Sequence, residues 1–104
     1  SRSVDVFVAT LGEPAQAVGL TVANRLRSHG ISVEARYTSM SLKAQMKLAD
    51  KLGAAKVVMI GENELKNGEA TIRDMRTKAQ TTVKLDDMVK FIGLQSGALT
   101  GNAR

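Results

Sequence analysis

The fold is decided by the stretch Val57-Val58-Met59-Ile60-Gly61-Glu62-Asn63-Glu64-Leu65-Lys66-Asn67-Gly68-Glu69-Ala70-Thr71-Ile72-Arg73-Asp74-Met75. It begins as an apolar run without alternation, which is typical of a strand covered on both faces, usually a parallel one. Two carboxylates, Glu62 and Glu64, follow the run, and the Asn67-Gly68 turn then leads into a strand that carries Arg73. Open α/β sheets bind ligands at the carboxyl ends of their strands. This stretch therefore predicts both the centre of a sheet and the rim of a site.

The composition bounds the class of protein. A chain of 104 residues with 43% hydrophobic and 24% charged residues is typical of one globular domain. There is no cysteine, which excludes disulfides and thiolate chemistry and fits a reducing compartment. No apolar run reaches the length of a transmembrane helix. Because the chain lacks an initiator Met and a strand is predicted within about three residues of Ser1, we expect a fragment of a longer protein.

The net charge of +5 favours a polyanionic partner such as nucleic acid. The alternative is a basic domain without any such partner, because the excess of positive charge is moderate. Charge alone leaves both readings open.

Periodicity predicts eight elements. Strands are expected over residues 4–9, 31–37 (a possible edge), 56–61, 69–76 and 80–85, and helices over about 14–29, 42–52 and 86–92. Two successive β-α-β units require a parallel arrangement, whereas the short connections after residue 68 favour antiparallel pairing. The predicted fold is α/β, a mixed five-stranded sheet with three helices in the order β-α-β-α-β-β-β-α. Residues 1–92 form the predicted domain and residues 93–104 a C-terminal tail.

The second predicted helix carries two faces. Ser41 is placed to cap it, and its packing arc includes Gln45 among apolar residues. Three lysines four residues apart form a separate basic stripe: Lys43, Lys47 and Lys51. The stripe is either a solvated helix face or a set of phosphate contacts, and the sequence favours neither.

The sequence contains few of the residue patterns that catalysis or cofactor binding requires. Gly12 stands alone after the first strand, so neither common phosphate-binding glycine pattern is present. One histidine, His29, and no cysteine leave no His/Cys metal site with known ligand spacing. Glu62 and Glu64 could form an acid–base pair, but no nucleophile or partner histidine accompanies them.

Carboxylates at a strand end have another use in a basic domain. A glutamate accepts hydrogen bonds from the amino groups of bases, and an arginine donates two to a guanine edge. Glu64 and Arg73 therefore suit the recognition of exposed bases in single-stranded RNA. The alternative for both Glu62 and Glu64 is a helix-start or turn-stabilising role. Of the two, Glu62 is the more structural candidate and Glu64 the candidate for base recognition.

Three stretches of the sequence carry a resemblance to a known family. Gly61-Glu62-Asn63-Glu64-Leu65-Lys66-Asn67-Gly68, followed by Ala70-Thr71-Ile72-Arg73-Asp74-Met75, resembles the C-terminal anticodon-binding domain of histidyl-tRNA synthetase. The helix sequence Ser41-Leu42-Lys43-Ala44-Gln45-Met46-Lys47-Leu48-Ala49 and the opening Val8-Ala9-Thr10-Leu11-Gly12-Glu13 resemble the same family. The likeness covers about residues 4–92. It implies the fold shared by the class IIa synthetases for His, Thr, Pro and Gly.

The resemblance also implies site residues. Glu64 and Arg73 match a base-contacting pair in the related threonine-specific domain, and Lys47 matches a basic position on the second helix. Ser39 stands where the related domain has an amide, and here the sequence departs from the family pattern. The implied anticodon contacts are Glu64, Arg73, Lys47, Glu62 and Ser39, and the implied phosphate contacts are Lys43, Lys51 and Lys66.

The implied partner is the anticodon stem-loop of tRNA(His). The catalytic motifs of class II synthetases are absent, so we expect no catalysis, cofactor or metal in this domain. We expect the parent chain to be an ATP-dependent histidine–tRNA ligase, cytoplasmic and dimeric through its catalytic domain, and the isolated domain to be a monomer. A regulatory or protein-interaction domain that has lost tRNA recognition is the main alternative, because fold alone does not decide function. A small-molecule-binding flavodoxin-like domain is a weaker one.

Overall fold

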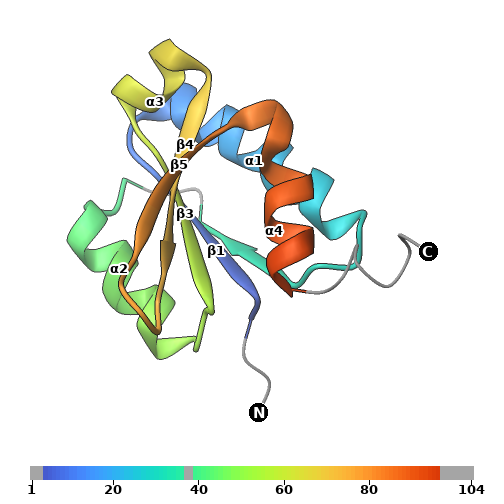
Figure 1. Ribbon diagram of the computed structural model, residues 1–104. Coiled ribbons are helices and arrows are strands. Elements are labelled where there is room, and N and C mark those ends of the chain that lie inside the picture. Colours follow the sequence, from blue (N-terminus) through green and yellow to red (C-terminus); the bar gives the residue numbers. More distant parts are fainter. Residues whose placement is uncertain (1–3, 37–38, 97–104) are drawn as a thin grey trace.

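The computed structural model describes residues 4–36 and 39–96 as a sheet of five strands with helices on both faces (Figure 1). The elements in chain order are β1 (Val6–Thr10), α1 (Glu13–Arg27), β2 (Val33–Ala35), α2 (Leu42–Lys51), β3 (Lys56–Ile60), α3 (Glu62–Asn67), β4 (Glu69–Asp74), β5 (Gln80–Lys84), a short 3-10 helix (Leu85–Asp87) and α4 (Met88–Ser96).

The strand order is β2-β1-β3-β4-β5, so β3 is central and β2 and β5 form the edges. β1 runs parallel to β2 and β3, whereas β3, β4 and β5 pair antiparallel. The predicted mixed five-stranded sheet is confirmed, as is the edge position of the second strand. At Gly68 the backbone adopts a left-handed conformation (φ 65°), which glycine adopts without strain, and the chain turns there into β4.

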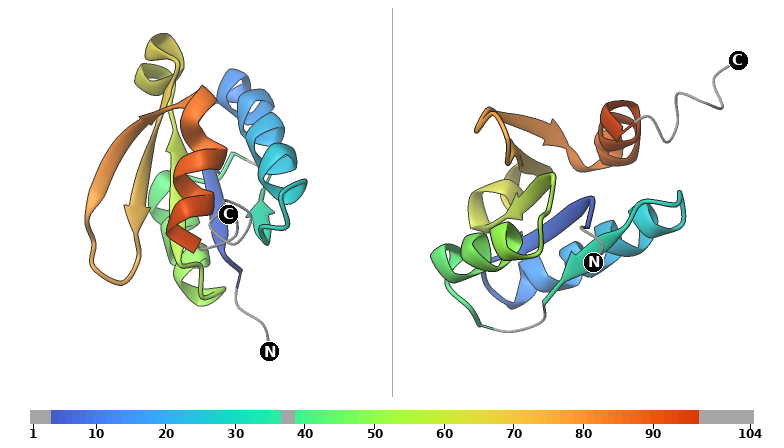
Figure 2. Two further views of the ribbon diagram at one scale, coloured as in Figure 1. Left: turned by 45° about the vertical axis from the view of Figure 1, so that its right-hand side comes forward. Right: turned by 90° about the horizontal axis from the view of Figure 1, so that it is seen from below.

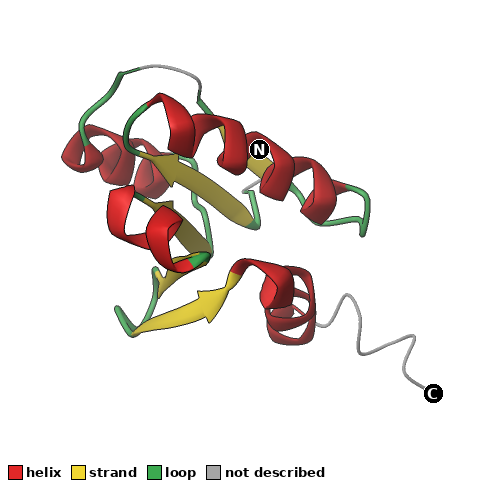
Figure 3. Ribbon diagram, turned by 90° about the horizontal axis from the view of Figure 1, so that it is seen from above, coloured by secondary structure: helices red, strands yellow, loops and turns green. Residues whose placement is uncertain are grey.

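The helices divide between the two faces of the sheet (Figures 1 and 2). α1 and α4 pack on one face, against a core that includes Val58, Ile60 and Ile72. α2 packs on the other face, against Phe7, Ala9 and Val57 of β1 and β3. Figure 3 shows helices on either side of the strands.

α2 does not cover the whole of its face. Ala70 and Ile72 of β4 point toward the α1 side and are buried, whereas Thr71 and Arg73 alternate to the α2 side and are half-buried. Their neighbours on β5, Thr82 and Gln80, are exposed. The α2 side of β4 and β5 is therefore an open sheet face beside a helix.

A buried amide side chain joins α2 to β1. Gln45 accepts a hydrogen bond from the Thr10 N–H (3.1 Å) and donates to the Thr10 carbonyl (2.8 Å) and the Met40 carbonyl (3.0 Å). β2 pairs with β1 only as far as Val8, so the outer edge of β1 has no strand partner at Thr10. The Gln45 amide makes the two hydrogen bonds to Thr10 that a neighbouring strand would otherwise make. Its bond to the Met40 carbonyl also holds the loop that leads into α2.

The structure differs from the predicted element order at α3, a fourth helix that the sequence pattern did not predict. It has six residues and none is buried, so it lacks the apolar stripe by which helices are predicted. The last helix begins at Met88, after the 3-10 helix, and continues to Ser96 rather than ending at residue 92. Tyr37 at the end of the predicted second strand, and residues 97–104 of the predicted tail, lie outside the described residues. The division after residue 92 stays a prediction.

Candidate functional site

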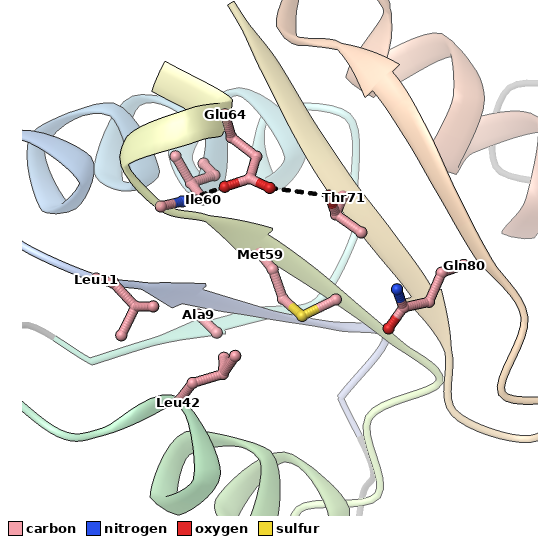
Figure 4. Close-up of a pocket in the computed structure, with 9 residues that line it drawn as sticks. Ala9, Leu11, Leu42, Met59, Ile60, Glu64, Thr71 and Gln80 are labelled. Atoms are coloured by element: carbon pink, nitrogen blue, oxygen red, sulfur yellow. Dashed lines mark hydrogen bonds between the residues drawn. The ribbon is translucent and has the colours of Figure 1, made fainter. Parts of the chain in front are cut away.

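A groove of about 270 Å³ lies at the carboxyl ends of β1 and β3 (Figure 4). Its floor is apolar, and its far wall carries three polar side chains: Glu64, Thr71 and Gln80. The lining residues are Ala9, Leu11, Leu42, Met59, Ile60, Gly61, Glu64, Thr71 and Gln80, and we call this the rim groove. Leu11 is 42% exposed at its edge.

Glu64 lies in the first turn of α3 and also lines the rim groove. Its Oε1 accepts a hydrogen bond from the Gly61 N–H (2.9 Å), and its Oε2 accepts one from the Thr71 hydroxyl (3.2 Å). Gly61 leaves room for this contact, because a Cβ there would lie 3.1 Å from Oε1. The helix-start role that was the alternative for both glutamates is therefore present at Glu64, and Glu62 makes no such bond in the described part of the chain. Each carboxylate oxygen keeps a second lone pair for a ligand.

Arg73 lies one step further along the same face of β4. Its Nη1 donates a hydrogen bond to the Oε1 of Gln80 (2.9 Å). Gln80 lies directly opposite Arg73 on β5. Its Nε is buried and has no hydrogen-bond partner among the described residues. A buried donor without a partner is costly, so the guanidinium is suited to donate a hydrogen bond to a ligand oxygen or ring nitrogen.

A second groove, of about 350 Å³, adjoins Arg73 on the side of α2. Its lining residues are Lys43, Met46, Lys47, Asp50, Arg73, Met75 and Lys78, and we call this the basic groove. Four of the seven are cationic and one is acidic. A concave surface lined mainly by one sign of charge concentrates oppositely charged ligands, so the basic groove suits a phosphate backbone.

The structure brings the two central predicted residues onto one surface but not into contact. Glu64 bonds to Thr71 and Arg73 bonds to Gln80, and no ion pair joins Glu64 to Arg73 in the described ranges. Glu64 lines the rim groove and Arg73 the basic groove. Both charged groups therefore remain available to a ligand.

The other predicted residues divide into two groups. Lys43 and Lys47 line the basic groove beside Arg73. Four are exposed and stand outside the lining of both grooves: Lys51 at the end of α2, Glu62 and Lys66 on α3, and Ser39 in the loop before α2. The geometry therefore favours Lys43 and Lys47 as contacts with a ligand, whereas the four exposed residues line neither groove. The roles of all six residues stay predictions.

Three site residues were not identified from the sequence: Thr71, Lys78 and Gln80. Thr71 lies on the same face of β4 as Arg73 by strand alternation, so the sequence pattern could have identified it as a site residue. Lys78 and Gln80 come from the β4–β5 connection, where no motif marks them. Lys78 reaches the basic groove through a left-handed backbone conformation (φ 70°).

The Asp74 side chain organises that connection. One carboxylate oxygen accepts from the backbone N–H groups of Thr77 (3.0 Å) and Arg76 (2.8 Å), and the other accepts from the Lys56 ammonium (3.2 Å). These contacts lower the pKa of Asp74 to about 2. The Thr77 N–H has the largest effect, followed by the Arg76 N–H and then by Lys56. They hold the turn that presents Lys78.

The low pKa of Asp74 predicts a pH-dependent contribution to stability. A carboxyl whose folded pKa is depressed stabilises the fold above its unfolded pKa, about 4, and the effect is lost as the pH falls toward 2. We expect Asp74→Asn to destabilise the protein at pH 7 and the difference from wild type to shrink between about pH 4 and pH 2. Urea unfolding over a pH series measures it. Thr77→Val, which loses only the bond from the Ala79 N–H, is the matched control, with a pH-independent difference. A constant Asp74→Asn difference down to pH 2.5 would contradict the assignment.

Two further structural findings bear on the site. Within the described ranges, no three His, Asp or Glu side chains gather as a metal site would require. No helix in the same ranges is long and apolar enough to cross a membrane.

Comparison with known proteins gives a family match over residues 5–94, to a model described as "Anticodon binding domain". The chain is 46% identical over 88 residues to a histidine–tRNA ligase from Pelotomaculum thermopropionicum, which covers 85% of this chain and 21% of that protein. It is also similar to the crystal structure of apo histidyl-tRNA synthetase from S. aureus, with a TM-score of 0.81 and 34% identity over 86% of this chain and 26% of that one.

A more distant structure shows the same fold. The RNA binding domain of threonyl-tRNA synthetase from Cryptosporidium parvum superposes with a TM-score of 0.80 at 21% identity, and it covers 88% of this chain and 23% of that one. The chain spans about a fifth of the length of the curated relatives it matches.

Proposed function

The chain belongs to the anticodon-binding domain family, and we propose that it is the tRNA-binding module of a histidine–tRNA ligase. In this proposal it recognises the anticodon loop of tRNA(His) at the rim of its sheet. Its identity of 46% and 44% to two histidine–tRNA ligases supports the choice of amino acid.

One observation carries the proposal: a groove with polar side chains on one wall adjoins a groove lined by cations. The rim groove offers an apolar floor for a base and an acceptor, Glu64, for its amino group. The basic groove offers Lys43, Lys47 and Lys78 for the phosphates on either side of that base. Single-stranded loops are recognised by this combination of exposed base edges and a charged path for the backbone.

The proposal extends to the parent protein. Histidine activation with ATP would be carried out by a part of the protein outside this chain, since the relatives are about five times as long. We propose a cytoplasmic enzyme that dimerises through that other part, and a domain that binds tRNA as a monomer without a cofactor of its own.

A titration of the 104-residue chain with two RNAs tests the proposal. One is the anticodon stem-loop of tRNA(His), and the other has the same stem with all three anticodon bases replaced. We expect the first to bind at least tenfold more tightly, because each base contact contributes on the order of 1–3 kcal/mol of discrimination. Equal binding would exclude anticodon recognition and favour the alternative of a regulatory domain.

Lys47→Ala tests the basic groove. We expect it to weaken cognate and altered stem-loops by the same factor, because a phosphate contact carries no base information. The slope of log affinity against log salt should become shallower by about 0.7–0.9, the value for one phosphate neutralised. Filter-binding titrations between about 50 and 200 mM salt measure the slope. Lys90→Ala is the matched control, since Lys90 is equally exposed but lies on α4 across the sheet; a similar change in both variants would exclude a local contact at Lys47.

A further inference from the structure

We infer that Gln80 is a second specificity-determining residue, whose amide nitrogen donates a hydrogen bond to a base in the rim groove while Arg73 fixes its orientation. The inference deepens the proposed function and rests on it. It assigns a base contact to a residue of β5, an element for which neither the motifs nor the family likeness suggests a role.

The first step is the orientation of the amide. The guanidinium of Arg73 has donors and no acceptor. Its Nη1 therefore requires the oxygen of the Gln80 amide, and that contact measures 2.9 Å. With the oxygen turned toward Arg73, the NH₂ group must point elsewhere. A glutamine amide can take two orientations. Only one of them is possible here, because Arg73 cannot accept a hydrogen bond from the NH₂ group.

The second step is where the NH₂ group points. Gln80 lines the rim groove together with Glu64 and Thr71. Figure 4 shows the amide nitrogen on the side of Thr71 and the oxygen away from it. Within residues 4–36 and 39–96 this nitrogen has no hydrogen-bond partner. Since Gln80 is exposed, water satisfies the group in the free protein and a ligand can replace that water.

The third step is complementarity. Along its polar wall, the rim groove presents an acceptor at Glu64 and a donor at Gln80, with Thr71 between them. A ligand that satisfies both must carry a donor and an acceptor on one edge. An unstacked nucleobase does so, and a volume of about 270 Å³ accommodates one such base. The ligand class of this subsite is therefore a single splayed-out base.

The arrangement also couples the two grooves. Arg73 lines the basic groove and Gln80 lines the rim groove, and one hydrogen bond joins them across β4 and β5. Residues in one network have non-additive effects when they are replaced. We therefore expect the loss from Gln80→Ala combined with Arg73→Ala to be smaller than the product of the two separate losses.

The test uses the 104-residue chain and a set of tRNA(His) anticodon stem-loops in which each loop base is changed singly. For Gln80→Ala we expect about tenfold weaker binding of the cognate loop and a relaxed preference at one loop position only. Gln80→Glu keeps an oxygen for Arg73 but replaces the donor by an acceptor, so we expect it to lose the preference at the same position. Thr82→Glu is the matched control for the added charge, because it lies on the same strand and face. It should weaken all the loops alike.

The outcomes separate the possible failures. Gln80→Ala with wild-type preferences at every position would overturn the inference, even though the proposed function would stand. Gln80→Glu with wild-type preferences would overturn the donor role, because only the support of Arg73 survives in that variant. Equal weakening of every loop by Gln80→Ala would likewise count against a base contact. If the wild-type chain itself does not distinguish the loops, the proposed function fails first and the inference fails with it. Urea unfolding midpoints of the variants establish that each is folded.

Discussion

Gln45→Ala is expected to lower the free energy of unfolding by about 3 kcal/mol. The substitution leaves the N–H and the carbonyl of Thr10 without partners, and Thr10 is only 5% exposed. Each buried backbone group that loses its partner costs about 1–3 kcal/mol. The Met40 carbonyl also loses a bond, so the loop before α2 should loosen together with the edge of β1. Urea unfolding followed by circular dichroism measures the change.

Two variants separate hydrogen bonding from packing at this position. Gln45→Met keeps the length and most of the volume of the side chain but makes none of the three hydrogen bonds, so it should be nearly as destabilising as Gln45→Ala. Lys51→Ala, on the exposed side of α2, should stay within about 0.5 kcal/mol of wild type. A Gln45→Met protein as stable as wild type would show that shape, and not the bonds to Thr10, is what the position requires.

Gln45 also shows where prediction from the sequence ends. Its helical spacing placed it correctly in the packing arc of α2, because periodicity depends only on neighbours along the chain. Its partner could not be predicted in this way. The need for an amide arises because β2 stops pairing with β1 before Thr10, and Thr10 lies 35 residues before Gln45 in the chain.

For the candidate site too, the sequence predicted what depends on local patterns and not what depends on distant parts of the chain. The run from Val57 to Ile60 and the glycine after it predicted the central strand and a candidate site at its carboxyl end, and strand alternation placed Arg73 on the face of β4 opposite Ile72. α3 was missed because its six residues bury nothing. Gly61 cannot supply the side-chain half of a capping box, so Glu64 showed only part of the usual helix-start pattern. Gln80 and Lys78 follow from the register of β4 and β5 and from the turn built by Asp74, neither of which leaves a local pattern.

Arg73→Ala is expected to weaken binding of the tRNA(His) anticodon stem-loop by about 1–3 kcal/mol, the scale of a bidentate contact to a base. Three features of the structure support an effect of this size. The guanidinium is half-buried, so its donors are partly removed from water. One of those donors is already held by Gln80, which limits the orientations available to the group. Its Nε is buried and lacks a partner among the described residues, so an acceptor that reaches it through a shift of the side chain adds a bond without breaking another.

The size of the loss alone does not separate a base contact from a phosphate contact, but the selectivity does. Arg73→Lys keeps the positive charge and loses the planar fork that donates two parallel bonds. If Arg73 contacts a base, Arg73→Lys should retain part of the affinity and lose the preference for the cognate base. If it contacts a phosphate, Arg73→Lys should keep the preference, and Arg73→Ala should weaken every loop by the same factor. Arg76→Ala controls for the removal of one positive charge, because Arg76 is exposed in the adjoining turn and stands outside the lining of both grooves. Because the Arg73 guanidinium is held by a neutral amide rather than by Glu64, its charge is not neutralised within the fold. The structure thus restricts the direction of the Arg73 guanidinium and leaves its charge without an ion pair among the described residues; under the proposed function, a base edge beside a phosphate backbone uses both.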